Sequence, residues 1–329
     1  MRSLCLHILI LLCVCISAAD AQDIHFSQFQ ASPLTLNPAL TGAFNGSYRL
    51  AANGRSQWRS VTVPYQTFGF SAERRGLSGM KNASAGLNMF YDQAGDSRLN
   101  TTHVNFAAAY AIPINKDQKL HIGAQPGISQ RKISYDDLTF DNDYFGRETG
   151  ESFASSQLFH MNLNTGIMWA YAPEKSNTHF NAGLAFFNLT RPRQSFFGNE
   201  EIRLDRRVSV HAGLSQRINQ RTWIQPAFIY SRQGTYQEFV TGGNLRYVLI
   251  EKRNEVRALY AGIWTRVGDA AIFSIGMDYD NLFIGLSYDL NYSRLVPASN
   301  HRGGFELALI YIIPEIIKRK HYRICPVHL

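Results

Sequence analysis

The sequence predicts an all-β, antiparallel transmembrane β-barrel of about 14 strands. Apolar side chains alternate with small or polar ones at period two, over segments of about ten residues. The connections between these segments are alternately short and long, as in bacterial outer-membrane barrels. No segment after residue 22 has the length and apolarity of a membrane-spanning helix, so a bilayer-spanning chain has to close into a barrel.

The strand prediction follows the alternation along the chain. At residues 282–290, for example, every second position is Leu, Ile or Tyr, and the intervening face carries Phe, Gly, Ser and Asp. A face rich in Gly, Ser, Asn and His suits a crowded or water-filled lumen better than the Lys-rich and Glu-rich face of a soluble sandwich. The predicted strands are residues 47–58, 66–73, 83–92, 100–112, 120–132, 158–171, 179–189, 207–215, 222–231, 237–248, 256–266, 270–279, 282–292 and 303–313.

The connections predict the orientation of the barrel. Those at 114–117, 217–220 and 280–281 are short, whereas 132–157 and 190–206 are long. Outer-membrane barrels have short periplasmic turns and longer outer loops, which places both termini in the periplasm. The connection at 267–269 is short where a longer outer loop is expected. High aromatic content, with 16 Tyr and 21 Phe, fits rings at membrane–water boundaries.

The N-terminus has the form of a secretory signal. Arg2 supplies a basic start, residues 4–16 are apolar, and Ala19 and Ala21 make a small-x-small cleavage site. We expect export through the Sec pathway and a mature chain that starts at Gln22. The alternative, a short membrane anchor, needs a longer apolar run.

Composition excludes several classes. Cys5, Cys13 and Cys15 leave with the signal and only Cys325 remains, so neither a disulfide scaffold nor a cysteine zinc site is expected. The formal net charge is +8, but an exported barrel does not meet nucleic acid. The expected surroundings are outer-membrane lipid and lipopolysaccharide.

The chain divides into a signal peptide at 1–21, an N-terminal periplasmic segment at 22–46, the barrel at 47–313 and a basic periplasmic tail at 314–329. Phe26, Phe29 and Leu36 need apolar surroundings, which favours an N-terminal segment that plugs or lines the periplasmic mouth. The alternative is a disordered leader.

The N-terminal segment carries a family resemblance. Residues 23–29 read DIHFSQF, 36–42 LNPALTG, 55–58 RSQW and 64–67 PYQT, and the tail reads ICPV at 324–327. These motifs resemble the PorP/SprF family of type IX secretion and gliding-motility membrane proteins. The last residues, 327–329, depart from the basic-aromatic ending expected of that family.

The resemblance implies an outer-membrane component that binds and anchors, or helps export, a large secreted protein or adhesin with a type B C-terminal domain. It also implies contact with periplasmic, peptidoglycan-linked components. The residues expected to bind partners are Phe26, Gln28, Asn37, Pro38, Gly42, Arg55, Trp58, Lys318, Arg319, Lys320, Cys325 and Pro326.

Constellations for catalysis and metal binding are weak, so no catalytic, metal or cofactor residue is predicted. His121 and His211 are predicted to face the lumen, where Ser129 or Ser215 would have to complete a hydrolase site, but no local motif supports one. The acidic run that starts at Asp141 fails the calcium-loop pattern.

The charge distribution suggests a docking surface. Basic residues in the predicted periplasmic turns and the tail either form a docking ring for an acidic partner or serve only solubility. They are Arg74, Arg75, Lys81, Lys116, Lys119, Arg217, Arg221 and the tail residues Lys318, Arg319, Lys320 and Arg323. The competing functions are a passive outer-membrane pore or transporter and, less well supported, a lumen hydrolase.

Overall fold

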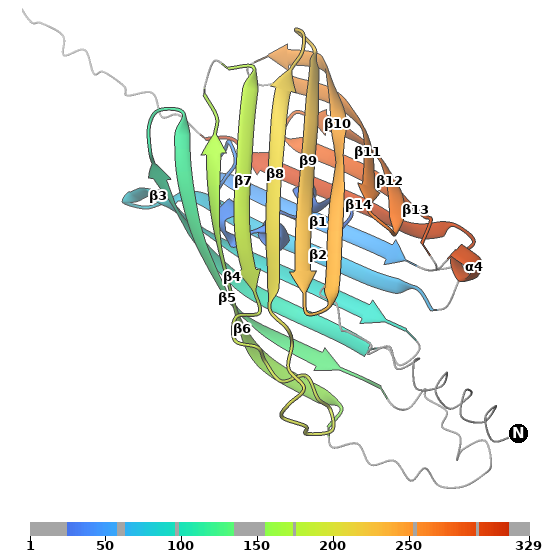
Figure 1. Cartoon of the computed structure of the whole chain (residues 1–329). Coiled ribbons are helices and arrows are strands. Elements are labelled where there is room, and N and C mark those ends of the chain that lie inside the picture. Colours follow the sequence, from blue (N-terminus) through green and yellow to red (C-terminus); the bar gives the residue numbers. More distant parts are fainter. Residues whose placement is uncertain are drawn as a thin grey trace, which may run out of the picture.

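The computed structural model describes residues 25–57, 63–95, 99–134, 155–173, 176–252, 255–293 and 296–315. Within these ranges, fourteen antiparallel strands follow one another around a closed barrel (Figure 1). The first strand pairs with the last along its whole length and closes the ring. The predicted fold class is confirmed. The predicted signal peptide, the acidic run at 136–143 and the basic residues of the tail lie outside the described residues.

Each predicted strand coincides with one in the structure, and most extend further than predicted. The strands are β1 (Tyr48–Gln57), β2 (Tyr65–Leu77), β3 (Met80–Ala94), β4 (Leu99–Pro113), β5 (Gln118–Lys132), β6 (Gln157–Tyr171), β7 (Thr178–Phe187), β8 (Arg207–Arg217), β9 (Thr222–Gln233), β10 (Tyr236–Lys252), β11 (Glu255–Arg266), β12 (Ala270–Tyr279), β13 (Leu282–Asn291) and β14 (Arg302–Ile313).

The extension corrects the placement of some basic residues. Arg74 and Arg75 belong to β2, Lys81 to β3, Lys119 to β5 and Arg217 to β8, although all five were predicted in turns. The reason is that antiparallel hydrogen bonding continues beyond the apolar part of the hairpin, down to the pair Leu77 and Met80. Polar side chains at such strand ends do not interrupt the pairing.

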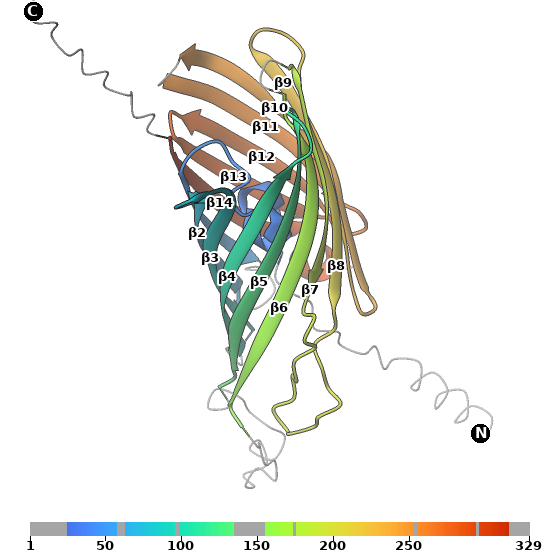
Figure 2. The same ribbon diagram turned by 90° about the vertical axis from the view of Figure 1, so that its left-hand side faces the viewer.

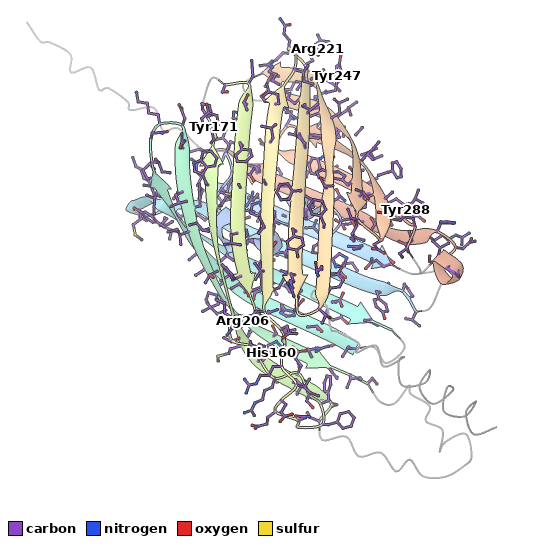
Figure 3. All side chains as sticks on the ribbon, in the orientation of Figure 1. His160, Tyr171, Arg206, Arg221, Tyr247 and Tyr288 are labelled. Atoms are coloured by element: carbon purple, nitrogen blue, oxygen red, sulfur yellow. The ribbon has the colours of Figure 1, made fainter. Side chains whose placement is uncertain are left out.

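The two ends of the barrel differ in the length of their connections. One end, here called the turn end, has the connections 78–79, 114–117, 172–177, 218–221, 253–254 and 280–281, and β1 starts there and β14 ends there. The other, the loop end, carries the two longest connections, 133–156 and 188–206. In Figure 3, Tyr171, Arg221 and Tyr247 lie at the turn end, and His160 and Arg206 lie at the loop end.

The outer face of the barrel is apolar. On the outer face of β4, β11 and β12, Phe106, Ile263 and Ile275 are more than 60% exposed, at 62%, 67% and 63%. Exposed aromatic side chains lie towards both ends: Tyr48, Tyr110, Trp169, Tyr247, Tyr279 and Tyr311 towards the turn end, and Phe159, Tyr288, Tyr292 and Phe305 towards the loop end. An apolar band between aromatic girdles is the surface that a bilayer-spanning barrel presents to lipid.

The inner face is polar, as the alternation predicts. Asn53, Asn88, Asn105, Gln125 and Ser209 are buried at positions between the exposed apolar ones. Their side chains point into the lumen, because successive side chains of a strand lie on opposite faces.

Residues 25–47, here called the N-terminal segment, lie inside the lumen (blue in Figures 1 and 2). The segment consists of three short helical pieces: η1 (Phe29–Ala31), α2 (Pro33–Leu36) and η2 (Pro38–Leu40). It reaches the turn end at Ser47, whose backbone N–H donates to Ile313 of β14. From Ser47 back towards residue 25, the segment extends into the lumen. It therefore lies deeper in the barrel than the predicted plug or lining of the periplasmic mouth.

Candidate functional site

The N-terminal segment occupies the middle of the lumen and is held there by apolar packing around Phe29. Phe29 meets Trp264 of β11 edge to face, with ring centroids 5.4 Å apart. Leu36, Val240 and Ile272 complete this core inside the barrel. Burying such side chains stabilises the seated segment by about 1.5–3 kcal/mol each.

The Asn37-Pro38 dipeptide sits on a glycine-lined patch of the barrel wall. Gly123, Gly166 and Gly183 lie on the adjacent strands β5, β6 and β7. A Cβ at Gly123 would overlap the backbone of Pro38, and one at Gly166 would overlap the side-chain oxygen Oδ1 of Asn37. The three glycines therefore let the segment approach the sheet backbone closely.

The Asn37 side chain uses this close approach. Its amide Nδ2 donates to the backbone oxygen of Ile167 at 3.1 Å and lies 3.1 Å from His211 Nε2. Its Oδ1 accepts from the backbone N–H of Ala39 at 2.9 Å and so caps η2. Asn37 is fully buried, with 0% of its surface exposed. One side chain thus shapes the segment and fastens it to the barrel.

A cluster of charges holds the other part of the segment towards the loop end. It consists of Arg55, Glu238, Arg266, Asp289 and Glu306, from β1, β10, β11, β13 and β14, and is called the charge cluster below. Arg55 lies 2.9 Å from Asp289, and Arg266 lies 3.4 Å from the same carboxylate. Buried charges of opposite sign have to be paired and hydrogen-bonded, because the low dielectric surroundings penalise a lone one.

The N-terminal segment completes the charge cluster. The two carboxylate oxygens of Glu306 accept from the backbone N–H groups of Ser27 and Gln28, at 2.7 and 2.9 Å. The Ser27 hydroxyl donates to Asp289 at 2.8 Å, and Arg55 donates to the backbone oxygen of His25 at 2.6 Å. Charge-assisted hydrogen bonds of this kind are about twice as strong as neutral ones.

A second ion pair holds the segment near the turn end. Arg49 of β1 donates to Glu73 of β2 at 2.7 and 2.9 Å, and Glu73 also accepts from the backbone N–H of Gly42 at 3.0 Å. Gly42 has φ +73°, a left-handed conformation that favours glycine. Arg49 further donates to the backbone oxygen of Leu40 at 3.2 Å.

Two cavities lie on either side of the seated segment. The loop-end cavity, of about 560 Å³, is bounded by Leu34 and Thr35 of the segment and by wall residues such as Asn105 and His160. The turn-end cavity, of about 550 Å³, is bounded by Gln28 and Phe29 and by wall residues such as Arg246. The segment thus separates two pockets within the barrel.

The structure brings together half of the residues that the sequence singled out. Phe26, Gln28, Asn37, Pro38 and Gly42 all belong to the seated segment, and Arg55 contacts it from the wall. In this arrangement they hold the segment within the barrel. Trp58, Lys318, Arg319, Lys320, Cys325 and Pro326 lie outside the described residues.

Sequence reasoning missed the wall residues that hold the segment. Glu73, Arg266, Asp289 and Glu306 are buried charged residues at inward positions of their strands. That pattern is the available signal, since an isolated charge facing a closed interior needs a partner. The sequence gives no indication of which residues pair.

Two lumen histidines, His103 and His211, contact polar side chains. His121 and His211 face inward as predicted, with 7% and 3% exposed, and His211 contacts Asn37. Ser129 pairs instead with His103, with 2.5 Å between Oγ and Nδ1. Among the described residues, no group of three or more His, Cys, Asp or Glu is placed to hold a metal ion, and no helix there is long and apolar enough to span a bilayer.

A closed barrel with an apolar outer band, aromatic side chains towards both ends and a lumen filled by its own N-terminal segment is a plugged outer-membrane β-barrel. The family model described as "Type IX secretion system membrane protein PorP/SprF" matches residues 18–311. The chain belongs to this family of secretion-system membrane proteins.

Solved structures resemble the chain in fold only. The toluene transporter TbuX of Ralstonia pickettii is 12% identical over 85% of this chain and 92% of its own, with a TM-score of 0.53. The P. putida toluene transporter TodX is 9% identical over 84% and 92%, with a TM-score of 0.49. A FadL homologue of Pseudomonas aeruginosa is 10% identical over 84% and 92%, with a TM-score of 0.48. Comparison with curated proteins finds no match.

Proposed function

We propose that this barrel is a docking component of the type IX machinery, which binds an exported protein that carries a type B C-terminal domain and anchors it or assists its export. The supporting observation is the N-terminal segment, which is tied to strands on opposite sides of the lumen by the Asn37 contacts and the charge cluster. A lumen filled in this way leaves the two ends of the barrel as the surfaces for recognition.

The two ends would face different partners. Bacterial barrels have short turns in the periplasm, so the turn end faces periplasmic components and the loop end faces the cell surface. Lys116, Lys119, Arg217 and Arg221 lie at the turn end and supply a basic rim. Part of this charge is neutralised, because Arg217 lies 3.6 Å from Glu251. The remaining charge favours an acidic surface on a periplasmic partner.

The function is recognition without catalysis. The protein holds a partner in a fixed orientation relative to the bilayer, and the seated segment makes the barrel more rigid. A lumen hydrolase would need His103 or another histidine as a base, and its activity would be lost on changing that histidine to Ala.

Affinity purification from detergent-solubilised outer membrane tests the proposal. The full-length protein should retain an exported protein with a type B C-terminal domain. A deletion strain should hold that protein inside the cell, and complementation should restore its surface display. Normal display in the deletion strain contradicts the proposal.

A basic-rim variant tests the periplasmic contact. Lys116→Glu combined with Lys119→Glu should weaken capture of periplasmic components and reduce its salt dependence. The matched control is Arg193→Glu, which changes an exposed charge in the connection 188–206 at the loop end. Equal capture by both variants would argue against the rim.

The alternative function is a passive pore or transporter. The observation that favours it is the pair of cavities, of about 560 and 550 Å³, that would join if the N-terminal segment moved. Planar-bilayer recordings separate the two functions. If the protein is a docking barrel, the wild type gives no stable conductance steps. If it is a pore, the wild type gives them.

A further inference from the structure

The loop-end cavity carries features that neither docking nor plugging uses. Its wall is a row of side-chain amides that face inward from neighbouring strands. Asn88 of β3 pairs in register with Asn105 of β4, Asn105 with Gly127 of β5, and Gly127 with Asn162 of β6. Adjacent strands are about 4.8 Å apart, so the row presents three amides across the wall, with Gly127 between the second and the third.

Part of this wall is fixed by its own hydrogen bonds. Asn164 donates to Gln125 at 3.0 Å, Gln125 donates to the backbone oxygen of Leu34 at 3.3 Å, and Asn162 donates to Asn188 at 2.5 Å. The amides are therefore held in place before any ligand arrives. Preorganised polar groups lose little entropy on binding, which is a property of specific ligand sites.

Two acceptors in this wall lack a donor. Asn105 is only 2% exposed and lines the cavity, and its Oδ1 has no hydrogen-bond partner among the described residues. Gln194, in the connection 188–206, lines the same cavity and its buried Oε1 has none either. A buried acceptor without a partner costs about 1–3 kcal/mol, so the cavity is suited to a ligand that brings donors.

Gly127 leaves room in the wall for the Asn105 side chain, which fills the space above it. A Cβ at this glycine would overlap Asn105 Oδ1, so the small residue keeps the unsatisfied oxygen in its position. On the row nearer the loop end, Phe90 stacks on His103 with centroids 4.2 Å apart. The cavity therefore offers amide groups and an aromatic pair side by side.

The charges around the cavity do not select an ion of one sign. Asp92, Arg131 and Arg207 all line it, and Arg207 is engaged by the Phe187 ring at 4.1 Å and by the backbone oxygen of Thr35 at 3.4 Å. A carboxylate or phosphate has only acceptors to offer and would leave Asn105 and Gln194 unsatisfied. A hydroxyl group both donates and accepts, as an amide does.

From these features we propose that the loop-end cavity binds an uncharged, polyhydroxylated ligand, namely the terminal sugar units of a glycan. Leu34 and Thr35 of the N-terminal segment bound the cavity on its inner side, so it suits the end of a chain better than its middle. Hydroxyl groups of the sugar donate to Asn105 and Gln194, and the aromatic pair packs against its apolar face. This site goes beyond the proposed recognition of an exported protein.

The test is titration calorimetry with the purified full-length protein in detergent. The probes are the delipidated polysaccharide of the host outer membrane and, separately, the neutral monosaccharides of its acid hydrolysate. Binding of the polysaccharide with the monosaccharides as weak competitors identifies a surface glycan as the source. Tighter binding of a monosaccharide identifies a free sugar, and absence of binding by both probes overturns the proposal.

Variants assign the binding to the cavity. Asn105→Leu should weaken binding at least tenfold, and Gln194→Leu should weaken it without touching a barrel strand. The matched control is Asn53→Leu, because Asn53 is an inward asparagine of β1 that also has an unpartnered Nδ2 but does not line the cavity. Binding unchanged in both cavity variants would place the glycan elsewhere and overturn the proposal.

Discussion

Arg55 and Asp289 are 234 residues apart in the sequence and meet at 2.9 Å inside the lumen, with 1% and 2% of their side chains exposed. The pair links β1 to β13 and also touches the N-terminal segment through His25 and Ser27. Its removal therefore affects both the barrel wall and the segment that fills it.

We expect Arg55→Ala to destabilise the barrel by about 3–5 kcal/mol, because it leaves a buried carboxylate incompletely compensated. The measurement is the urea midpoint for loss of the heat-dependent electrophoretic shift. Arg193→Ala is the control, since Arg193 and Glu200 form a pair that is 58% and 67% exposed. Such a pair contributes about 0–1 kcal/mol. Similar midpoints for the two variants would show that the buried pair does not hold the structure.

The glycine patch predicts a steric effect. Gly166→Ala should destabilise the seated segment by about 1–3 kcal/mol, because the new methyl group overlaps Asn37 Oδ1. Protease cleavage within residues 25–47 measures release of the segment. Gly213→Ala is the matched control: a Cβ at this inward glycine meets its neighbours at 3.4–3.7 Å, an ordinary contact. Cleavage that rises equally in both variants would contradict the seating role.

The outer face predicts a dependence on depth in the membrane. Phe106 is 62% exposed near the middle of β4, and Phe106→Lys should cost about 2–4 kcal/mol, as expected for a charge at the bilayer midplane. Phe197→Lys, at an equally exposed phenylalanine in the connection 188–206, should change stability by about 0.5 kcal/mol or less. Refolding into lipid vesicles gives both free energies. A tolerated charge at position 106 would place this face away from lipid.

The apolar anchor predicts a spectroscopic change. Phe29→Ala removes the ring that packs on Trp264 and should cost about 3–5 kcal/mol of stability. The emission of Trp264 should shift to longer wavelength as water enters the space. Phe159→Ala, at an outward position that is 74% exposed, should leave the emission unchanged. An unchanged spectrum in Phe29→Ala would mean that another side chain fills the gap.

The strands were predictable because their signal is local. Alternation along residues 282–290 states which side chains share a face, and the structure places Gly285, Ser287 and Asp289 inside as that pattern requires. The same pattern places His121 and His211 in the lumen. Alternation at period two can be recognised within a single segment, without information from the rest of the chain.

The contacts that fill the lumen were not predictable in this way. The sequence predicts that the apolar residues Phe26, Phe29 and Leu36 are buried, but it does not predict that Trp264 contacts Phe29. Glu306 and Ser27 are 279 residues apart, and their hydrogen bond depends on the closure of the whole barrel. Long-range pairing of this kind depends on the register of every strand between the two residues.

Closure of the barrel and seating of its N-terminal segment are coupled steps of assembly. Arg55 and Glu306 lie opposite each other in the register of β1 and β14, the two strands that meet last in a chain that forms hairpins in order. Both residues also bind the segment. Residues 25–28 therefore supply some of the hydrogen-bonding groups that Arg55 of β1 and Glu306 of β14 need. A barrel that closed around an empty lumen would leave these two charged side chains without those hydrogen bonds.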